Sequence, residues 1–199
     1  MNPVKRPSRR LFIAILSSAA LSLVGCAAGP AEPRYGSPTY KIVSFATREQ
    51  PGTIVVDPTN HFLYLVQSGG QSLQYEVGVG KEGYGWSGVA TVRNKQEWPD
   101  WYPTRETLER KPEIRQAIDR LPNGTGIPGG PDNPLGARAL YLWQGNTDTL
   151  YRIHGTNEPN TIGHDVSAGC IRMRNEDVID LYNRTPVGTK VVVLAAHSA

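Results

Sequence analysis

Residues 53–66, Thr-Ile-Val-Val-Asp-Pro-Thr-Asn-His-Phe-Leu-Tyr-Leu-Val, contain two β-prone runs separated by a short polar stretch. Val, Ile, Tyr and Phe favour strands, and Pro-Thr-Asn at 58–60 favours a reversal of the chain, so the stretch predicts a β-hairpin. Farther along, residues 72–79 alternate polar and apolar side chains. This period of two indicates a further, half-buried strand beside the hairpin.

The rest of the chain extends this β-rich pattern. Three more runs are rich in strand-forming residues: 89–92, 139–143 and 190–194. Helical patterns are short and few: 104–110, 112–120 and 175–182. The last of these begins with Asn175, a favourable N-cap residue, followed by two acids. We therefore expect a mainly β, single β-sandwich-like domain with a few short helices.

The N-terminus has the layout of an export signal. Residues 1–26 carry four basic side chains and then an apolar run over 11–24, as in a signal peptide. The run is shorter than the about 20 apolar residues that span a bilayer. Residues 27–50, rich in Pro and Gly without periodicity, predict a flexible tether. The folded domain is then expected over 51–194.

The end of this leader, Leu-Val-Gly-Cys at 23–26, resembles the lipobox of bacterial lipoproteins. We expect Cys26 to carry lipid and to hold the domain at a membrane, with cleavage near Ala27 and loss of Cys26 as the alternative. Ala27 directly after the cysteine resembles lipoproteins sent to the outer membrane, so the expected location is the periplasm. Residues 8–13 also resemble a twin-arginine export signal, and the export route stays open.

The charge of the chain is concentrated in this leader. The leader contains four of the 21 Lys and Arg residues and none of the 18 acidic ones, so the remaining chain is nearly balanced. A nucleic-acid-binding protein would show a basic patch or stripe. We therefore expect no nucleic-acid partner.

The residues that suggest chemistry lie in 151–173, Tyr-Arg-Ile-His-Gly-Thr-Asn-Glu-Pro-Asn-Thr-Ile-Gly-His-Asp-Val-Ser-Ala-Gly-Cys-Ile-Arg-Met. Cys170 is the only cysteine after the leader, and His154 precedes it by 16 positions. A cysteine nucleophile needs a base within hydrogen-bond reach and N–H groups that stabilise an oxyanion. Gly169 has no side chain and allows close approach of a substrate. This combination suits acyl transfer.

The two elements resemble the signature of the L,D-transpeptidase family, also called the YkuD or ErfK/YbiS/YcfS/YnhG group. That signature is His-Gly-Ser/Thr, a gap, and Ser/Thr-x-Gly-Cys continuing into Ile-Arg. The chain has His-Gly-Thr at 154–156 and Ser-Ala-Gly-Cys-Ile-Arg at 167–172. Many members have a second His where this chain has Ala168. The likeness covers about 51–194 and implies an L,D-transpeptidase catalytic domain.

The resemblance implies a role for each residue of the signature. Cys170 would attack the substrate carbonyl, and His154 would take and return the proton. The carbonyl oxygen of Gly155 would orient the imidazole as the third member of a triad. The N–H groups of Gly169 and Cys170 would bind the oxyanion.

Four further residues are expected at the substrate site. Arg172 would hold a substrate carboxylate, with a structural salt bridge as the alternative. We also assign Ser167, Thr156 and Trp101 to substrate binding, with coverage of the core edge as the alternative for Trp101. His164 has no companion at metal-ligand spacing, so we expect it at the rim and expect neither a metal nor a cofactor.

For the activity, the resemblance implies acylation of Cys170 by a peptidoglycan stem peptide at the third stem residue, with release of the terminal D-Ala. The acyl group would pass to a neighbouring stem, forming a 3-3 crosslink, or to an envelope protein. Water as acceptor would instead make the protein an L,D-carboxypeptidase or amidase, and a non-catalytic wall-binding lipoprotein is the third alternative. A papain-like protease is disfavoured because there the cysteine precedes the histidine.

Overall fold

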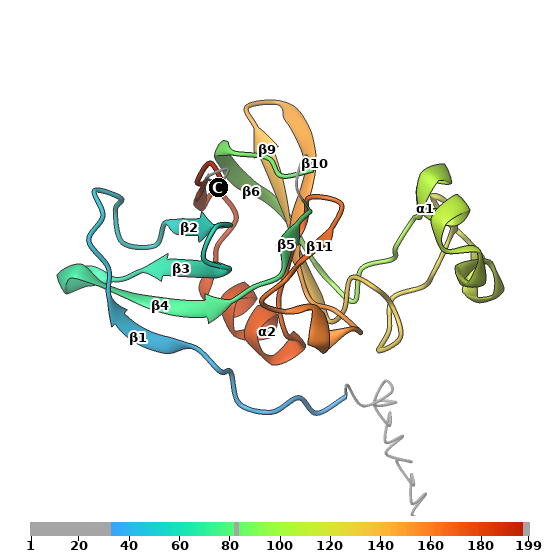
Figure 1. Ribbon diagram of the computed structural model, residues 1–199, viewed down its shortest axis with the longest axis horizontal. Coiled ribbons are helices and arrows are strands. Elements are labelled where there is room, and N and C mark those ends of the chain that lie inside the picture. The colour runs from blue at the N-terminus through green and yellow to red at the C-terminus, as the bar shows by residue number, and fades with distance from the viewer. Residues whose placement is uncertain (1–32, 82–83, 197–199) are drawn as a thin grey trace, which may run out of the picture. The chain divides into compact units, whose positions relative to one another are not determined.

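The computed structural model describes residues 33–81 and 84–196 (Figure 1). The predicted leader and Cys26 lie outside these residues. No helix in the described part of the chain combines the length and the apolar character needed to cross a membrane.

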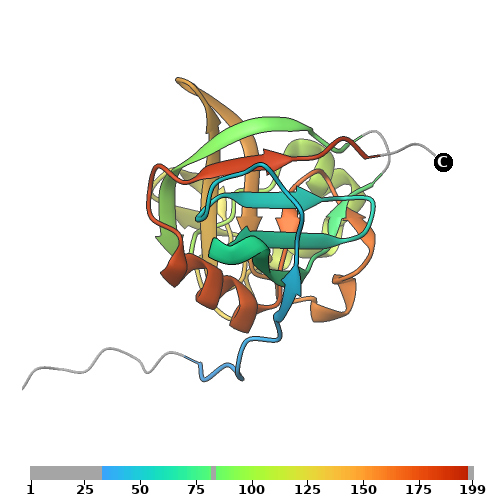
Figure 2. The ribbon, with the colours of Figure 1, turned by 90° about the vertical axis from the view of Figure 1, so that its left-hand side faces the viewer.

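One large mixed sheet dominates the described residues. Its nine strands are, in spatial order, β1 (Lys41–Ser44), β4 (Gln71–Glu76), β3 (Phe62–Val66), β2 (Ile54–Asp57), β13 (Lys190–Val193), β6 (Gly88–Glu97), β9 (Arg138–Gln144), β10 (Thr147–His154) and β12 (Ile171–Arg172). The β13–β2 and β10–β12 pairs are parallel, and the other neighbours are antiparallel. Figure 2 shows β2, β3 and β4 side by side, with β13 next to β2.

The remaining elements are short. Two small sheets are formed by β5 (Val79–Gly80) with β11 (Asp165–Ser167) and by β7 (Asp119–Leu121) with β8 (Gly124–Gly126). The α-helices are α1 (Arg105–Arg110) and α2 (Asn175–Arg184), and 3-10 helices lie at Ser68–Gly70, Pro112–Ala117 and Pro159–Thr161. The prediction of a mainly β domain with few short helices is confirmed.

The predicted hairpin forms between β2 and β3, with Ile54 opposite Leu65 and Asp57 opposite Phe62. The Asp57 carboxylate closes the turn because it accepts hydrogen bonds from the N–H and the side-chain amide of Asn60, at 3.2 and 2.7 Å. An Asx turn of this kind holds the reversal without requiring glycine.

The larger of two hydrophobic clusters in the described residues joins both halves of the sheet. Fully buried side chains come from the hairpin half, from the β6–β9–β10 half and from α2, and the largest include Tyr75, Leu63, Leu140, Leu142, Ile153 and Leu181. Because these residues form one cluster, the sheet folds over the core rather than lying flat. The helix α2 covers this core beside β9 (Figure 1).

The predicted strand at 72–79 is broken at Gly78. Residues up to Glu76 pair with β3, whereas Gly78 exchanges two hydrogen bonds with Arg172, at 2.8 and 2.9 Å. The chain therefore switches partners and carries β5 to the neighbourhood of β12. This switch links the hairpin to the segment that contains Cys170.

The segment predicted as a flexible tether, 27–50, is partly built into the domain. Residues Lys41–Ser44 form the edge strand β1, and Thr39 donates two hydrogen bonds to the buried carboxylate of Asp177, at 2.6 and 2.9 Å. The prediction of a free linker was wrong for these residues. An edge strand keeps most of its side chains in solvent, so it leaves no hydrophobic pattern to read.

Candidate active site

The predicted nucleophile and base lie on neighbouring parallel strands. In the β10–β12 register, Ile153 is opposite Ile171 and His154 is opposite Arg172. Cys170, directly before β12, is therefore level with Arg152. Paired positions point to the same face of a sheet and faces alternate along a strand, so Cys170 and His154 share one face, two residues apart in the strand direction.

His154 is a buried imidazole with one nitrogen already bonded. The ring is 3% exposed, and its Nδ1 lies 2.6 Å from the carbonyl oxygen of Gly155. A carbonyl oxygen can only accept, so Nδ1 carries the hydrogen and Nε2 keeps its lone pair. Burial, together with the charge of Arg172, lowers the pKa of His154 to about 4, although the Gly155 carbonyl raises it. The ring is neutral at pH 7 and can accept a proton.

Cys170 is the one free cysteine of the described residues and is partly exposed. Its Sγ lies 4.0 Å from the carbonyl oxygen of Leu150. Burial raises the pKa of the thiol, and the backbone N–H of Arg152 and the charges of Arg152 and Arg172 offset only part of this rise. The thiol form therefore dominates at neutral pH, so attack on a carbonyl requires a base.

The loop that presents Cys170 is held by Ser167. The buried Ser167 hydroxyl donates to the carbonyl oxygen of Cys170 at 2.6 Å and accepts from the N–H of Gly169 at 3.0 Å. Gly169 has φ +116, and a Cβ there would overlap with the Tyr151 ring and with the Tyr84 carbonyl. Only glycine fits this close approach without strain.

This arrangement changes two of the predicted roles. We predicted that the Gly169 N–H binds the oxyanion, but this N–H already donates to the Ser167 hydroxyl and is not free for that role. Of the two proposed donors, the Cys170 N–H remains as the candidate. Ser167, predicted to bind substrate, uses its hydroxyl inside the loop.

A bulge in β10 brings backbone groups to the thiol. The register with β9 shifts between Asp148 and Arg152, and Leu150 within the bulge has φ +62 and is 76% exposed. A non-glycine residue at positive φ is uncommon. Here the conformation of Leu150 is stabilised by its own N–H, which donates to the Asp148 carboxylate at 2.9 Å. The bulge directs the Leu150 carbonyl towards Cys170.

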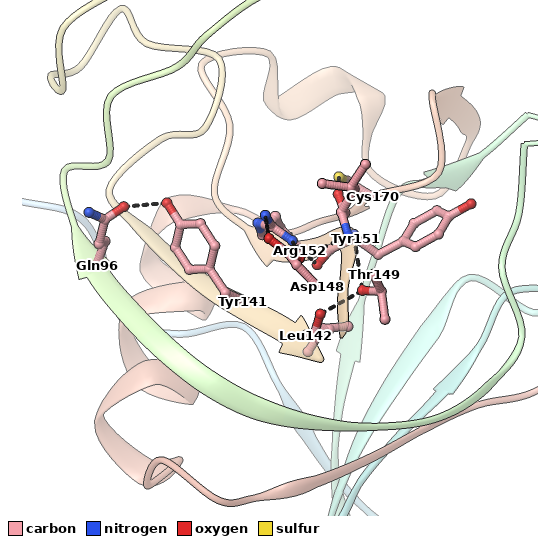
Figure 3. A network of polar contacts seen from close by, with 9 residues as sticks. Gln96, Tyr141, Leu142, Asp148, Thr149, Tyr151, Arg152 and Cys170 are labelled. Atoms are coloured by element: carbon pink, nitrogen blue, oxygen red, sulfur yellow. Dashed lines mark hydrogen bonds and ion pairs between the residues drawn. The ribbon is translucent and has the colours of Figure 1, made fainter. Parts of the chain in front are cut away.

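Arg152 is fixed beside the thiol by an ion pair on its own strand. Its two terminal nitrogens donate to the two carboxylate oxygens of Asp148, at 2.7 and 2.8 Å, and its guanidinium lies 4.4 Å from the Tyr141 ring. Figure 3 shows this network, which continues from Tyr141 to Gln96 and has Cys170 at its other side. Burial raises the pKa of Asp148, but the hydrogen bonds from Arg152 and Leu150 outweigh it, and the net shift is downwards. The pair therefore stays ionised.

Arg172 forms a salt bridge, which was the alternative to substrate binding. Its guanidinium lies 3.0 Å from Glu158, whose second oxygen lies 3.5 Å from the ammonium of Lys111. The arginine side chain is 17% exposed, and its positive charge acts to lower the pKa of both His154 and Cys170.

The other predicted site residues are placed as follows. Thr156 is buried, and its hydroxyl accepts from the N–H of Glu158 at 2.9 Å, so it shapes the loop after His154 rather than facing solvent. Trp101 is half-buried and exchanges two backbone hydrogen bonds with Ile127, at 2.9 and 2.8 Å. His164 is exposed. Within the described residues, no group of three or more His, Cys, Asp or Glu side chains could hold a metal.

One functional candidate was missed by the sequence reasoning. We predicted Asn175 as the N-cap of the helix, but α2 begins at Asn175 itself and Arg174 is the capping position. The Asn175 side chain instead reaches Ala137 and Thr156, on the loops before β9 and after His154. An Asn near a helix start has a sufficient local explanation, so nothing in the sequence indicated these distant partners.

A cavity of about 650 Å³ adjoins the loop that carries Cys170. Gly169 and Ile171 contribute to its wall, together with Lys81 and with Trp86, whose ring stacks on Tyr151 at 5.7 Å. The volume falls within the usual range for small-molecule sites. Neighbouring residues on a strand point to opposite faces of the sheet. The part of the cavity wall formed by Ile171 therefore lies on the face opposite the Cys170 side chain.

Comparison with known proteins gives a consistent assignment. Residues 51–193 match the family model of the L,D-transpeptidase catalytic domain, YkuD. The chain is 38% identical over 146 residues to the probable L,D-transpeptidase ErfK/SrfK of Escherichia coli, which covers 71% of this chain and 43% of that protein. The chain thus spans less than half the length of this curated relative.

Solved structures show the same fold. A Brucella melitensis crystal structure described as a probable carnitine operon oxidoreductase is 50% identical, with a TM-score of 0.51, over 82% of this chain and 96% of that one. The oxidoreductase description applies to the Brucella melitensis protein. An L,D-transpeptidase from Mycobacterium smegmatis matches at 18% identity and TM-score 0.52, over 73% of this chain and 59% of that one.

Proposed function

The chain belongs to the L,D-transpeptidase catalytic-domain family, and we propose that it exchanges peptide bonds in peptidoglycan stem peptides through an acyl-enzyme on Cys170. In this proposal His154 is the general base and acid. The acyl acceptor is the amine of a neighbouring stem or of an envelope protein.

The observation that carries this proposal is the hydrogen bond from His154 Nδ1 to the Gly155 carbonyl, on the same sheet face as Cys170. It leaves the Nε2 lone pair of a neutral imidazole available to a thiol whose own pKa is raised. A neutral thiol and a neutral base suit proton transfer during the attack, with no pre-formed ion pair.

The proposed reaction has two steps. Cys170 Sγ forms a bond to the carbonyl carbon of the third stem residue while its proton passes to His154 Nε2, and the Cys170 N–H stabilises the oxyanion. The amide C–N bond then breaks, and His154 returns the proton to the departing D-Ala amine. In the second step an amine attacks the thioester, the C–S bond breaks, and the proton of the amine returns to the sulfur. Bond exchange of this kind requires no external energy source.

The direct test is intact-mass spectrometry of the full chain mixed with a diaminopimelate-containing tetrapeptide muropeptide. We expect a tripeptide-sized adduct on the wild-type protein and none on Cys170→Ala. Removal of the base in His154→Asn should slow adduct formation about 100- to 10,000-fold, the range of general base catalysis.

The products distinguish the alternatives. Joined stems among the products support transpeptidation, whereas tripeptide alone would identify water as the acceptor and a carboxypeptidase. An absence of both adduct and turnover would favour a wall-binding protein without catalysis.

We also propose that the protein is exported and anchored by lipid on Cys26, in the periplasm and preferably at the outer membrane. The signal-like layout of residues 1–26 supports this proposal. Mass spectrometry of the mature N-terminus tests it: a lipid-modified cysteine at position 26 is expected, and an unmodified N-terminal residue would contradict the anchor.

A further inference from the structure

The peptide bond between Gly155 and Thr156 connects the catalytic base to helix α2. Its carbonyl oxygen, on Gly155, lies 2.6 Å from His154 Nδ1, and its N–H, on Thr156, donates to the side-chain oxygen of Asn175 at 3.2 Å. A trans peptide is planar, and its C=O and N–H point in opposite directions. A group that holds the N–H therefore also sets the direction of the carbonyl that orients the imidazole.

Both the oxygen and the nitrogen of the Asn175 side-chain amide form hydrogen bonds. Its Oδ1 also accepts from the N–H of Ala137 at 2.9 Å, and its Nδ2 donates to the carbonyl oxygen of Thr156 at 2.9 Å. The side chain thus contacts both the N–H and the C=O of Thr156, which leaves that residue little freedom to rotate. Its support is rigid because α2 is anchored in the core by Val178 and Leu181, both fully buried.

The Asn175 side-chain amide is tightly packed between two loops. A Cβ at Gly155 would overlap with Asn175 Oδ1, and a Cβ at Gly136 would overlap with the same atom. Gly136 also has φ +61, a conformation that side chains other than glycine rarely adopt. Two glycines on separate loops thus form a slot in which the Asn175 amide lies.

We propose that Asn175 is a positioning residue that fixes the Gly155 carbonyl and thereby keeps His154 in the Nδ1–H tautomer, with Nε2 directed to the reaction. Asn175 acts through the peptide and touches neither substrate nor thiol. Its effect on turnover rests on the proposed transpeptidase function, whereas its effect on the tautomer does not.

The test compares Asn175→Ala with Asn183→Ala, an exposed asparagine on the same helix. The first readout is the ¹⁵N NMR spectrum of the full chain labelled at histidine, which separates protonated from unprotonated ring nitrogens. The second is kcat and KM for muropeptide crosslinking. An unfolding curve for each variant separates loss of structure from loss of positioning.

In Asn175→Ala we expect the His154 signals to change from a single Nδ1–H form to a mixture of both tautomers. We expect kcat to fall about 10- to 100-fold with KM changed less than twofold, because misplacement of a catalytic group by about 1 Å has an effect of this size. Asn183→Ala should resemble the wild-type protein in both readouts.

Asn175→Asp is the closest variant in shape: a carboxylate oxygen can still accept from the N–H groups of Ala137 and Thr156, which are the contacts that hold the Gly155–Thr156 peptide, while the donor to the Thr156 carbonyl oxygen is lost. It should retain the Nδ1–H tautomer and lose less kcat than the alanine variant, and it carries the test if the alanine variant does not fold. An unchanged His154 tautomer in Asn175→Ala, or a tautomer mixture in Asn175→Asp, would overturn the inference. If the wild-type protein turns over no muropeptide, the proposed function fails, while the NMR comparison still decides the role of Asn175.

Discussion

Replacement of His154 by Asn should remove a pH dependence of stability that the folded site creates. The pKa of His154 is about 4 in the folded protein, against an ordinary value of 6.5. Between these values the unfolded chain binds a proton at this residue and the folded chain does not. The free energy of unfolding therefore rises with pH across this window. The contribution linked to His154 is fully present above pH 6.5 and is lost as the pH falls to about 4.

The size of the effect follows from the same two values. Each pKa unit corresponds to about 1.4 kcal/mol, so the shift of His154 to about 4 makes the folded state about 3 kcal/mol less stable at pH 4 than at pH 7 through this residue alone. His154 is 3% exposed, so solvent screening is slight. Asn at this position keeps a donor for the Gly155 carbonyl and removes the basic ring.

The assay is urea unfolding of the full chain at pH 4, 5, 6 and 7. Between pH 7 and pH 4, the free energy of unfolding should fall by about 3 kcal/mol more in the wild-type protein than in His154→Asn. Subtracting the two changes removes the contributions of other titrating groups, which both proteins share. His164→Asn is the matched control, because it makes the same substitution at an exposed histidine. Equal slopes for the wild-type protein and His154→Asn would refute the burial argument. The pH profile of kcat/KM gives an independent check. An acidic limb with its midpoint near pH 6.5, instead of near pH 4, would also refute the burial argument.

Three further outcomes are expected at the same site. Gly169→Ala should lower kcat about 100-fold, because the new Cβ would overlap with Tyr151 and displace the nucleophile; near-normal turnover would show that the loop adapts. Ser167→Ala should lower the free energy of unfolding by about 1–3 kcal/mol, measured by urea titration, since the Gly169 N–H and the Cys170 carbonyl lose their partner. Muropeptide turnover should persist in EDTA; activity that disappears in EDTA and returns with zinc would contradict the metal-free mechanism.

Much of the architecture could be predicted because it depends on local pattern. The hairpin of β2 and β3 follows from β-prone runs around an Asp-Pro-Thr-Asn turn, and the inward face of β4 follows from its period of two. The edge strand β1 could not be predicted in this way, since its exposed side chains carry no such pattern. The ends of elements were also uncertain, as the start of α2 at Asn175 shows.

The sequence by itself predicted Cys170 as the nucleophile and His154 as its base, because such a pair is recognised by residue type and by the Gly residues beside it. It could not specify their chemical state. The burial of His154, its Nδ1–H tautomer and the occupied N–H of Gly169 arise only when β10 and β12 pair and the loops close around them.

Asn175 illustrates the difference most clearly. Its residue type and its place at a helix start suggested a local cap, whereas its side chain bonds to residues 38 and 19 positions away. Contacts of this length depend on how helix and sheet pack, and no local pattern encodes them. Residue type and local periodicity thus determined which groups could do the chemistry, and tertiary packing decided their protonation, their orientation and which backbone donors stayed free.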